Sequence, residues 1–234
     1  VDGISGTLTI VNSEFSGNDS DLDGTGTGVS AANVTGEVLL QGVTSSGSAN
    51  GIVLDTIGGD ITIESDPVST QETVVEANSG TGLSISNSSS STVTVSGASF
   101  NGNGINGIHL TNVADVLLTD VTANLNGNHG LLIDGATSLL ETNGIYRSNG
   151  VDGLNLSNIP VVTFNGTEGT LSGENSVTFF NINTVNVIGA IWDNPLDGDL
   201  VGTINLTAGT HRMEHYEQIL ANDIILKDGA LLIG

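Results

Sequence analysis

A glycine-led motif recurs along most of the chain at nearly constant spacing, and it limits the fold more than any other feature. Each copy is a glycine followed by three residues, the first and third of them apolar, as in Gly107-Ile-His-Leu. The glycines are Gly28, Gly51, Gly82, Gly107, Gly130 and Gly153, spaced by 23, 31, 25, 23 and 23 residues. An internal repeat of about this length indicates a solenoid or another repeat architecture.

Two further apolar segments follow each glycine. The second segment alternates apolar and polar residues and lies at 38–40, 61–63, 93–95, 116–118 and 162–164, with Leu139 and Leu140 in the same place less regularly. The third is shorter and includes Val43, Ala98 with Phe100, Val121 with Ala123, and Ile145. Three short alternating strands per coil would fill a triangular interior and wet its exterior. An antiparallel sandwich would not need a constant coil length, so we predict an all-β parallel solenoid with coils of about 23 residues.

The repeat extends to the start of the chain but changes at two places. Residues 7–18 can be aligned with 92–103, which pairs Phe15 with Phe100. Roughly ten coils rising about 4.8 Å each would make a rod near 50 Å long. The 31-residue coil after Gly51 holds an insertion at 66–73, which we expect to project as a loop.

The period becomes irregular beyond Gly166. Residues 176–189, 203–206 and 223–233 still have strand patterns, whereas 210–222 favours a short helix with Thr210 as its N-cap. We therefore divide the chain into β-helix repeats at 1–189 and a C-terminal β segment at 190–234, with this helical or irregular element capping or linking the solenoid. We expect one continuous domain, and a segment of a longer protein.

Asn-Gly pairs provide a second repeated signal. They begin at Asn50, Asn101, Asn103, Asn106, Asn126, Asn143, Asn149 and Asn165. Asn tolerates left-handed backbone conformations and glycine adopts them freely, so the pairs predict turns, and equivalent Asn side chains could hydrogen-bond from coil to coil. With these pairs, the coils of residues 28–166 resemble the right-handed parallel β-helix repeats shared by pectate-lyase-like enzymes, phage tailspikes and large bacterial surface proteins of the adhesin type. The resemblance implies a fold but no particular activity.

The charge balance narrows the choice of partners. The chain has 3 Lys and Arg against 26 Asp and Glu, a net charge of −23. So acidic a surface disfavours nucleic acid and anionic membranes and favours cations. There is no cysteine to form disulfides or thiolate sites, and no apolar run long enough for a membrane span.

One acidic stretch has the spacing of a calcium loop. Asp19, Asp21 and Asp23 alternate and are followed by Gly24, with Thr25 as a further oxygen ligand, as in EF-hand-like loops. Ser30 stands where such a loop carries glutamate, so a solvated acidic turn is the alternative. A weaker calcium cluster comprises Asp193, Asp197 and Asp199.

Histidines offer little recognisable catalytic pattern. Residues 211–215 fit H-x-x-E-H, an inverted zincin pattern, but only 19 residues follow for a further ligand. A polar capping helix is the simpler interpretation. His109 is expected to point outward between Ile108 and Leu110, and His129 to lie in a turn.

The resemblance to pectate-lyase-like enzymes implies one main enzymatic function, that of a polysaccharide lyase or glycoside hydrolase. A lyase typically needs a basic residue beside calcium-bound uronate, and this chain offers Arg147, Arg212 and Lys227. A hydrolase needs paired carboxylates and usually aromatic sugar platforms. The carboxylates of neighbouring coils have no diagnostic spacing, and the aromatic residues are dispersed; these residues are Asp115, Asp120, Asp134, Trp192, Tyr146 and Tyr216.

We therefore favour a non-catalytic structural or adhesive segment of a large secreted or cell-surface protein. It would extend from the surface and display loops, with calcium as a stabilising ion. Its expected partners are neighbouring domains, further copies that assemble end to end into a filament, and carbohydrate.

Overall fold

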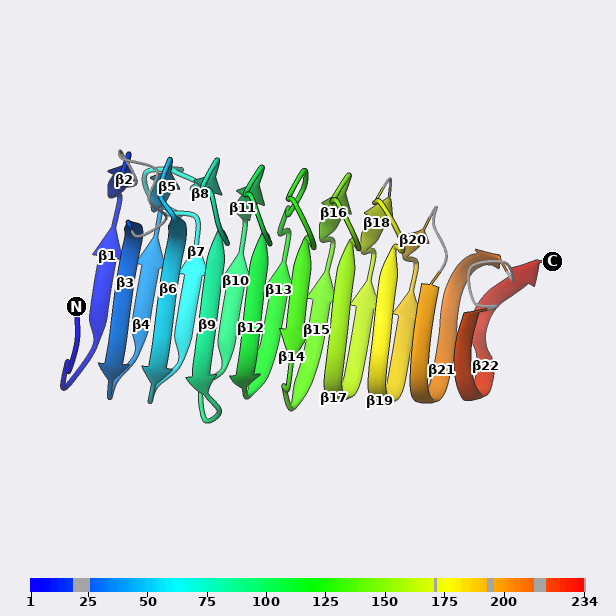
Figure 1. Cartoon of the computed structure of the whole chain (residues 1–234). Coiled ribbons are helices and arrows are strands. Elements are labelled where there is room, and N and C mark those ends of the chain that lie inside the picture. The colour runs from blue at the N-terminus through cyan, green and yellow to red at the C-terminus, as the bar shows by residue number, and fades with distance from the viewer. Residues whose placement is uncertain (19–25, 171, 193–195, 213–217, 234) are drawn as a thin grey trace.

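The computed structural model describes residues 1–18, 26–170, 172–192, 196–212 and 218–233, and these form a parallel β-solenoid (Figure 1). The chain winds through about eight turns, with its two ends at opposite ends of the rod. This is fewer than the roughly ten coils expected from the chain length and the 23-residue period. The all-β fold and the 23-residue coil are confirmed.

Three faces make up each coil. Face A contains β3 (Thr27–Val34), β6 (Asn50–Ile57), β9 (Leu83–Ser88), β12 (Ile108–Val113), β14 (Leu131–Asp134) and the start of β17 (Leu154–Asn165). Face B contains β1 (Leu8–Val11), β4 (Val38–Gln41), β7 (Ile61–Glu64), β10 (Val93–Ser96), β13 (Asp115–Thr119), β15 (Ser138–Thr142) and the end of β17. Face C contains β2 (Glu14–Ser16), β5 (Thr44–Ser46), β8 (Thr73–Glu76) and β11 (Ala98–Asn101), then β16 (Ile145–Arg147), β18 (Glu168–Thr170) and β20 (Ile191–Trp192).

Parallel pairing sets equivalent residues of successive coils directly on top of one another. Leu131 pairs with Leu154, 23 residues later, and Ile108 with Leu131. The proposed alignment of the first coil is also correct, because Phe15 and Phe100 occupy the same column of face C through Ser45 and Val75.

The C-terminal coils differ from the prediction. β19 (Val177–Ile188) pairs with β21 (Leu196–Arg212) at a spacing of 19 residues, so the repeat shortens here without ending. The expected helix at 210–222 is wrong in the described residues, since β21 runs to Arg212 and β22 (Gln218–Ile233) begins at Gln218. Residues 210–212 pair in parallel with β22, and this ladder overrides the local helical pattern. Residues 213–217 lie outside the described residues.

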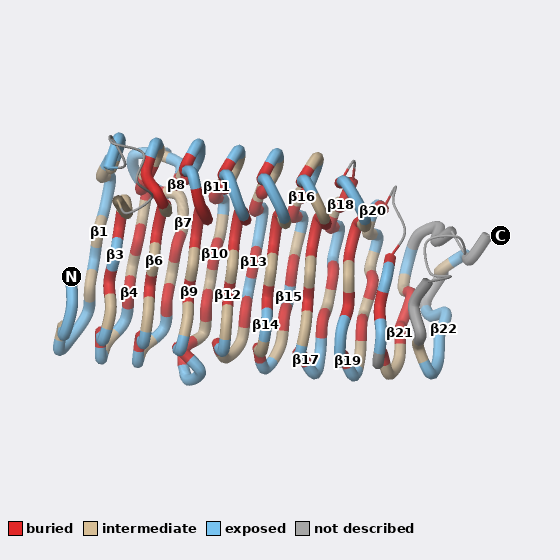
Figure 2. Tube along the Cα trace, in the orientation of Figure 1, coloured by how far each residue is buried: buried red, intermediate tan, exposed pale blue. Residues whose placement is uncertain are grey.

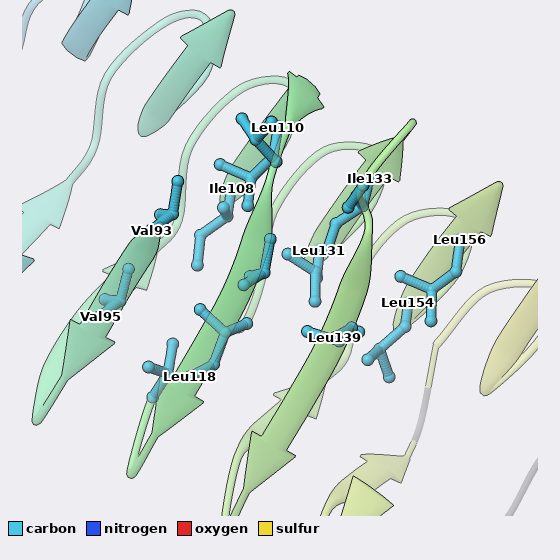
Figure 3. Packing of buried hydrophobic residues seen from close by; sticks show 14 of the residues in the cluster. Val93, Val95, Ile108, Leu110, Leu118, Leu131, Ile133, Leu139, Leu154 and Leu156 are labelled. Carbon is cyan, nitrogen blue, oxygen red and sulfur yellow. The ribbon is translucent and has the colours of Figure 1, made fainter. Parts of the chain in front are cut away.

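The core is a continuous column of aliphatic side chains inside the coils. Buried residues recur from coil to coil (Figure 2), and in Figure 3 Ile108 and Leu110 are followed by Leu131 and Ile133 one coil later. Alternation places one residue in two inside, as the sequence predicts. On face C the inward residue of β16 is Tyr146, in the column of Phe100 and Ala123, whereas Ile145, expected to be the apolar position, pairs with outward Thr122 and is only half-buried. The described part of the chain has no helix suited to crossing a membrane.

The repeated glycine at the start of face A is required by close backbone stacking. A Cβ on Gly107 would lie 2.7 Å from the carbonyl oxygen of Gly130, and a Cβ on Gly130 would lie 2.7 Å from that of Gly153. Cβ atoms essentially never approach so closely, so a side chain here would force the coils apart. The column ends at Ser176, the residue stacked on Gly153.

A buried asparagine ladder runs beside this column. Asn78 donates from Nδ2 to Asn103 Oδ1 at 2.9 Å, Asn103 to Asn126 at 3.2 Å, and Asn126 to Asn149 at 3.0 Å. The predicted stacking of Asn side chains is therefore confirmed for Asn103, Asn126 and Asn149. Each side-chain oxygen also accepts the backbone N–H of the preceding ladder residue, as Asn149 does from Asn126 at 3.0 Å.

The prediction that Asn-Gly pairs serve left-handed turns holds for only some of them. Gly102, Asn143 and Gly166 have positive φ, whereas no residue of the Asn103, Asn126 and Asn149 pairs does. In those pairs the glycine follows because a Cβ would overlap the carbonyl of the preceding coil, as Gly127 would with Gly104.

Replacing a ladder residue should destabilise the whole rod. Asn126→Ala removes an acceptor from Asn103 and a donor to Asn149 in a site from which water is excluded. We expect the free energy of unfolding to fall by about 2–4 kcal/mol. Denaturant unfolding measures this, with Asn128→Ala as the control, because Asn128 is exposed on the same turn. Equal losses in both variants would contradict the role of the ladder.

Candidate functional site

The best candidate for a catalytic group is a set of titratable side chains on face A and in the turns before its strands. His109 lies on β12 and points away from the core between buried Ile108 and Leu110, as predicted. His129 precedes β14 in the turn one coil later, and Asp152 occupies the same place one coil further on, before β17. The 23-residue register therefore stacks Asp152 on His129.

The two side chains lie close together. His129 Nδ1 is 3.4 Å from Asp152 Oδ2 without the geometry of a hydrogen bond, and Asn155 Nδ2 donates to the same oxygen at 3.0 Å. The other oxygen of Asp152 accepts the backbone N–H of Asn175 at 3.3 Å. Burial by itself would raise the pKa of Asp152, but the nearby His129 ring and the hydrogen bond from Asn155 outweigh it and lower that pKa.

His109 is half-buried beside the pair. Burial lowers its pKa, Asp134 opposes this shift by its negative charge, and His129 adds to it. Its Nε2 lies 3.1 Å from the Thr111 hydroxyl. Two histidines and an aspartate in neighbouring coils are the residue types of general acid–base catalysis, which requires a substrate within hydrogen-bond reach. The side chains of His129 and Asp152 are only 16% and 4% exposed, however, so little of the pair faces solvent.

The sequence interpretation did not identify Asp152. Aligning the coils would have found it, because it follows His129 by 23 residues and precedes Asn175 by 23. The same column holds Asn106, whose side-chain oxygen accepts the backbone N–H of His129 at 3.2 Å. Asp152 thus also serves the coil-to-coil bonding that Asn provides elsewhere.

Other carboxylates of the candidate hydrolase set follow this pattern and do not converge. Asp134 accepts from Ser157 at 2.8 Å and from Asn158 at 2.7 Å, both one coil later. Asp55, which is not one of the predicted carboxylates, accepts in the same way from Ser86 and Asn87. Asp115 accepts from Ser138, and Asp120 from Asn143, again one coil on.

The candidate lyase bases and aromatic platforms are also separated. Arg147 donates to both carboxylate oxygens of Glu168, and this pairing raises the pKa of Arg147. Lys227 is exposed on β22, far along the chain from it. Tyr146 and Trp192 are core residues, and Trp192 packs edge-on against Phe164 with ring centroids 5.4 Å apart. Tyr216 lies outside the described residues.

The predicted calcium residues fall mostly outside the described residues. These are Asp19, Asp21, Asp23, and Asp193; Thr25 also lies there. Asp197 and Asp199 are described, and both are exposed at alternate positions of β21. Among the described residues no group of three or more His, Asp or Glu side chains is arranged to hold a metal ion.

A carboxyl group is buried inside the solenoid at Glu141. It accepts a hydrogen bond from the Thr167 hydroxyl and lies beside the ring of Tyr146. Burial is the main cause that raises the pKa of Glu141 to about 8, against 4.5 for the free side chain. Burial also raises the pKa of Tyr146. Both side chains are fully buried, so they affect the stability of the fold and do not form a site that a ligand could reach.

Comparison with known proteins agrees with this architecture. The family described as "Right handed beta helix region" matches residues 2–119, which is half of the chain. The chain belongs to the right-handed β-helix family. No curated protein sequence gives a significant match.

A solved β-helix structure extends the comparison beyond residue 119. A double mutant of the periplasmic alginate epimerase AlgG matches with a TM-score of 0.60 and 12% sequence identity. The match covers 97% of this chain and 51% of the epimerase chain, so this chain spans about half of that protein's length. At this identity the likeness establishes a shared fold.

Glu141 should make the stability of the rod depend on pH. Its pKa is raised on folding from 4.5 to about 8, so the stability that the protonated Glu141 contributes is fully present below pH 4.5 and is lost as the pH rises through 8. We expect a loss of about 3–5 kcal/mol over this range. Glu141→Gln should remove this slope, whereas Glu72→Gln, at an exposed position, should retain it. Denaturant unfolding from pH 4 to 9 measures both; an unchanged slope in Glu141→Gln would contradict the assignment.

Proposed function

We propose that this chain is a structural or adhesive β-helix segment of a large secreted or cell-surface protein, without catalytic activity of its own. The observation that carries the proposal is the use of polar side chains as links between coils along the described rod. Asn78 to Asn149 link successive coils inside, and Asp55, Asp115, Asp120 and Asp134 do so outside.

Such linking suits a stiff extending element. Each coil contacts mainly its neighbours, so length is gained by adding coils without changing the core. The insertion at 66–73 is an ordered loop on the surface of the rod. Asp66 accepts hydrogen bonds from the backbone N–H groups of Val68 and Ser69, and Val68 is 90% exposed. Asn12, two coils earlier in the stack, also donates to Asp66.

Polysaccharide cleavage, by a lyase or a hydrolase, is the second candidate. The grouping of His109, His129 and Asp152 on face A favours it, and the solved structure that shares the fold is described as an alginate epimerase. Against it, the oxygens of Asp152 are already bonded to Asn155 and Asn175.

Incubation with polysaccharides separates the two candidates. We expect neither new reducing ends nor unsaturated products when the protein is mixed with uronate and neutral polysaccharides. Product that forms with the unmodified chain and is lost in His129→Ala would overturn the structural proposal and establish the enzyme. Retained melting temperature in that variant is the control for folding.

Calcium remains part of the proposal as a stabilising ion at Asp19, Asp21, Asp23 and Thr25. The alternating carboxylates support it, as does the strongly negative charge. The exposed pair Asp197 and Asp199, with Asp193, is a second location.

Titration tests the calcium proposal directly. We expect calcium to release or absorb heat in isothermal titration and to raise the melting temperature, with chelator reversing the rise. Asp21→Asn with Asp23→Asn should abolish the heat if the first loop is the site, and Asp197→Asn with Asp199→Asn should do so if the second is. An unchanged melting temperature with no heat would end the proposal.

Extracellular placement and end-to-end partners complete the proposal. Ile224 and Leu226 of β22 stack on buried Ile204 and Leu206 yet are 41% and 48% exposed. A further coil, from a neighbouring domain or another copy, would cover them. The periplasmic origin of the structure that shares the fold supports export of this chain.

A further inference from the structure

A groove lies at the corner between faces A and B in the coils of β3, β6 and β9. It has a volume of about 370 Å³ and is lined by the last residues of these three strands and by the turns that follow them. Val34 and Ile57 lie beneath its floor and are only 1% and 2% exposed. The polar lining is exposed and consists of Asn33, Thr35, Thr56, Asn87, Ser89 and Ser90.

The groove exists because this corner is wider in the early coils. Four residue steps lead from Ile57 to Ile61, the next inward position, and five from Ser88 to Val93, whereas three lead from Val113 to Val116. The longest of these corners, a serine turn at 88–91, projects beyond the end of β9 (Figure 1). The groove is therefore a local feature of three coils and does not continue along the rod.

The serine turn is held rigidly. Ser91 N–H donates to Ser88 O at 2.9 Å and closes the turn. Ser91 Oγ donates to Ile57 O at 2.7 Å, and Ser88 Oγ accepts from Ile57 N–H at 3.0 Å. Ser89 and Ser90 are thus presented on a preformed support, which reduces the entropy that a ligand would have to overcome.

Hydrogen-bonding capacity is left over along the lining. The Asn33 and Asn87 amide nitrogens donate to Asp2 and Asp55, which leaves their amide oxygens as acceptors. The hydroxyls of Thr35, Ser89 and Ser90 have no hydrogen bond within the described part of the chain. Hydroxyls can both donate and accept, so the lining can match groups of either kind.

The chemistry of the lining selects a neutral ligand. None of the lining residues is charged. The nearby Asp55 carboxylate is already bonded to Ser86 and Asn87, and these bonds lower its pKa. A net charge of −23 repels anionic ligands such as uronates. Neutral, hydroxyl-rich ligands fit a lining whose exposed side chains are amides and hydroxyls.

We propose that this groove binds one or two residues of a neutral saccharide. The proposal goes beyond the structural function, which depends on the stacking of coils and not on this corner. It places carbohydrate recognition at the corner of the rod, away from His109, His129 and Asp152.

Isothermal titration of the whole chain with neutral gluco-, galacto- and manno-oligosaccharides, and with uronate oligosaccharides, tests the proposal. We expect at least one neutral series to bind and the uronates not to bind. Ser90→Trp fills the groove at an exposed turn position, and Thr35→Ala with Ser89→Ala removes two free hydroxyls. Each should weaken binding about tenfold or more. Thr119→Trp, exposed on face B and outside the groove, is the matched control and should bind like the unmodified chain.

The alternative outcomes are distinct. Failure of every neutral saccharide to bind, stronger binding of uronates, or equal binding by Ser90→Trp would overturn the groove assignment. Melting temperatures of all variants check that they fold. A folded chain without saccharide binding removes the groove as a site and leaves the structural function intact, whereas release of products from a polysaccharide contradicts the structural function whatever the groove binds.

Discussion

The rod depends on direct stacking of each coil on the next at the spacing of parallel β-strands. At that spacing every residue meets the residue at the equivalent position of the neighbouring coil, so each residue type must be compatible with the one stacked on it. Glycine at 107 and 130 satisfies this by having no side chain. Asparagine at 103 and 126 satisfies it by donating and accepting at once. Aliphatic residues satisfy it by packing in rows.

Stacking is least favourable for charged side chains, so the many carboxylates of this chain need partners of another kind in the next coil. Identical carboxylates in adjacent coils would repel each other at close range. In the described rod Asp55 and Asp134 are each followed by a serine and an asparagine one coil later, which donate to the carboxylate. Glu37 and Asp60 are adjacent in one column, but both are exposed, where solvent screens them. Many carboxylates therefore act as acceptors in the stack.

Sequence reasoning succeeded where the information is periodic. The position of Gly107 and its alternating neighbours fixed face A, and the alignment of Phe15 with Phe100 fixed the first coil. It failed where the conformation of a segment depends on a neighbouring coil. Residues 210–212 form a strand because β22 pairs with them. The same applies to the candidate site. The partners of Asp152 and the corner that forms the groove come from different coils, so no single segment displays them.

Three aromatic residues pack together in the C-terminal half of the rod, where Trp192 contacts Phe164, and Phe164 contacts Phe179. The chain contains a single tryptophan, and it is nearly buried. Its fluorescence therefore reports on this end alone, while circular dichroism reports on strands throughout. If the coils separate progressively instead of all at once, the two signals will change at different denaturant concentrations, and their order will reveal the end from which the rod unwinds.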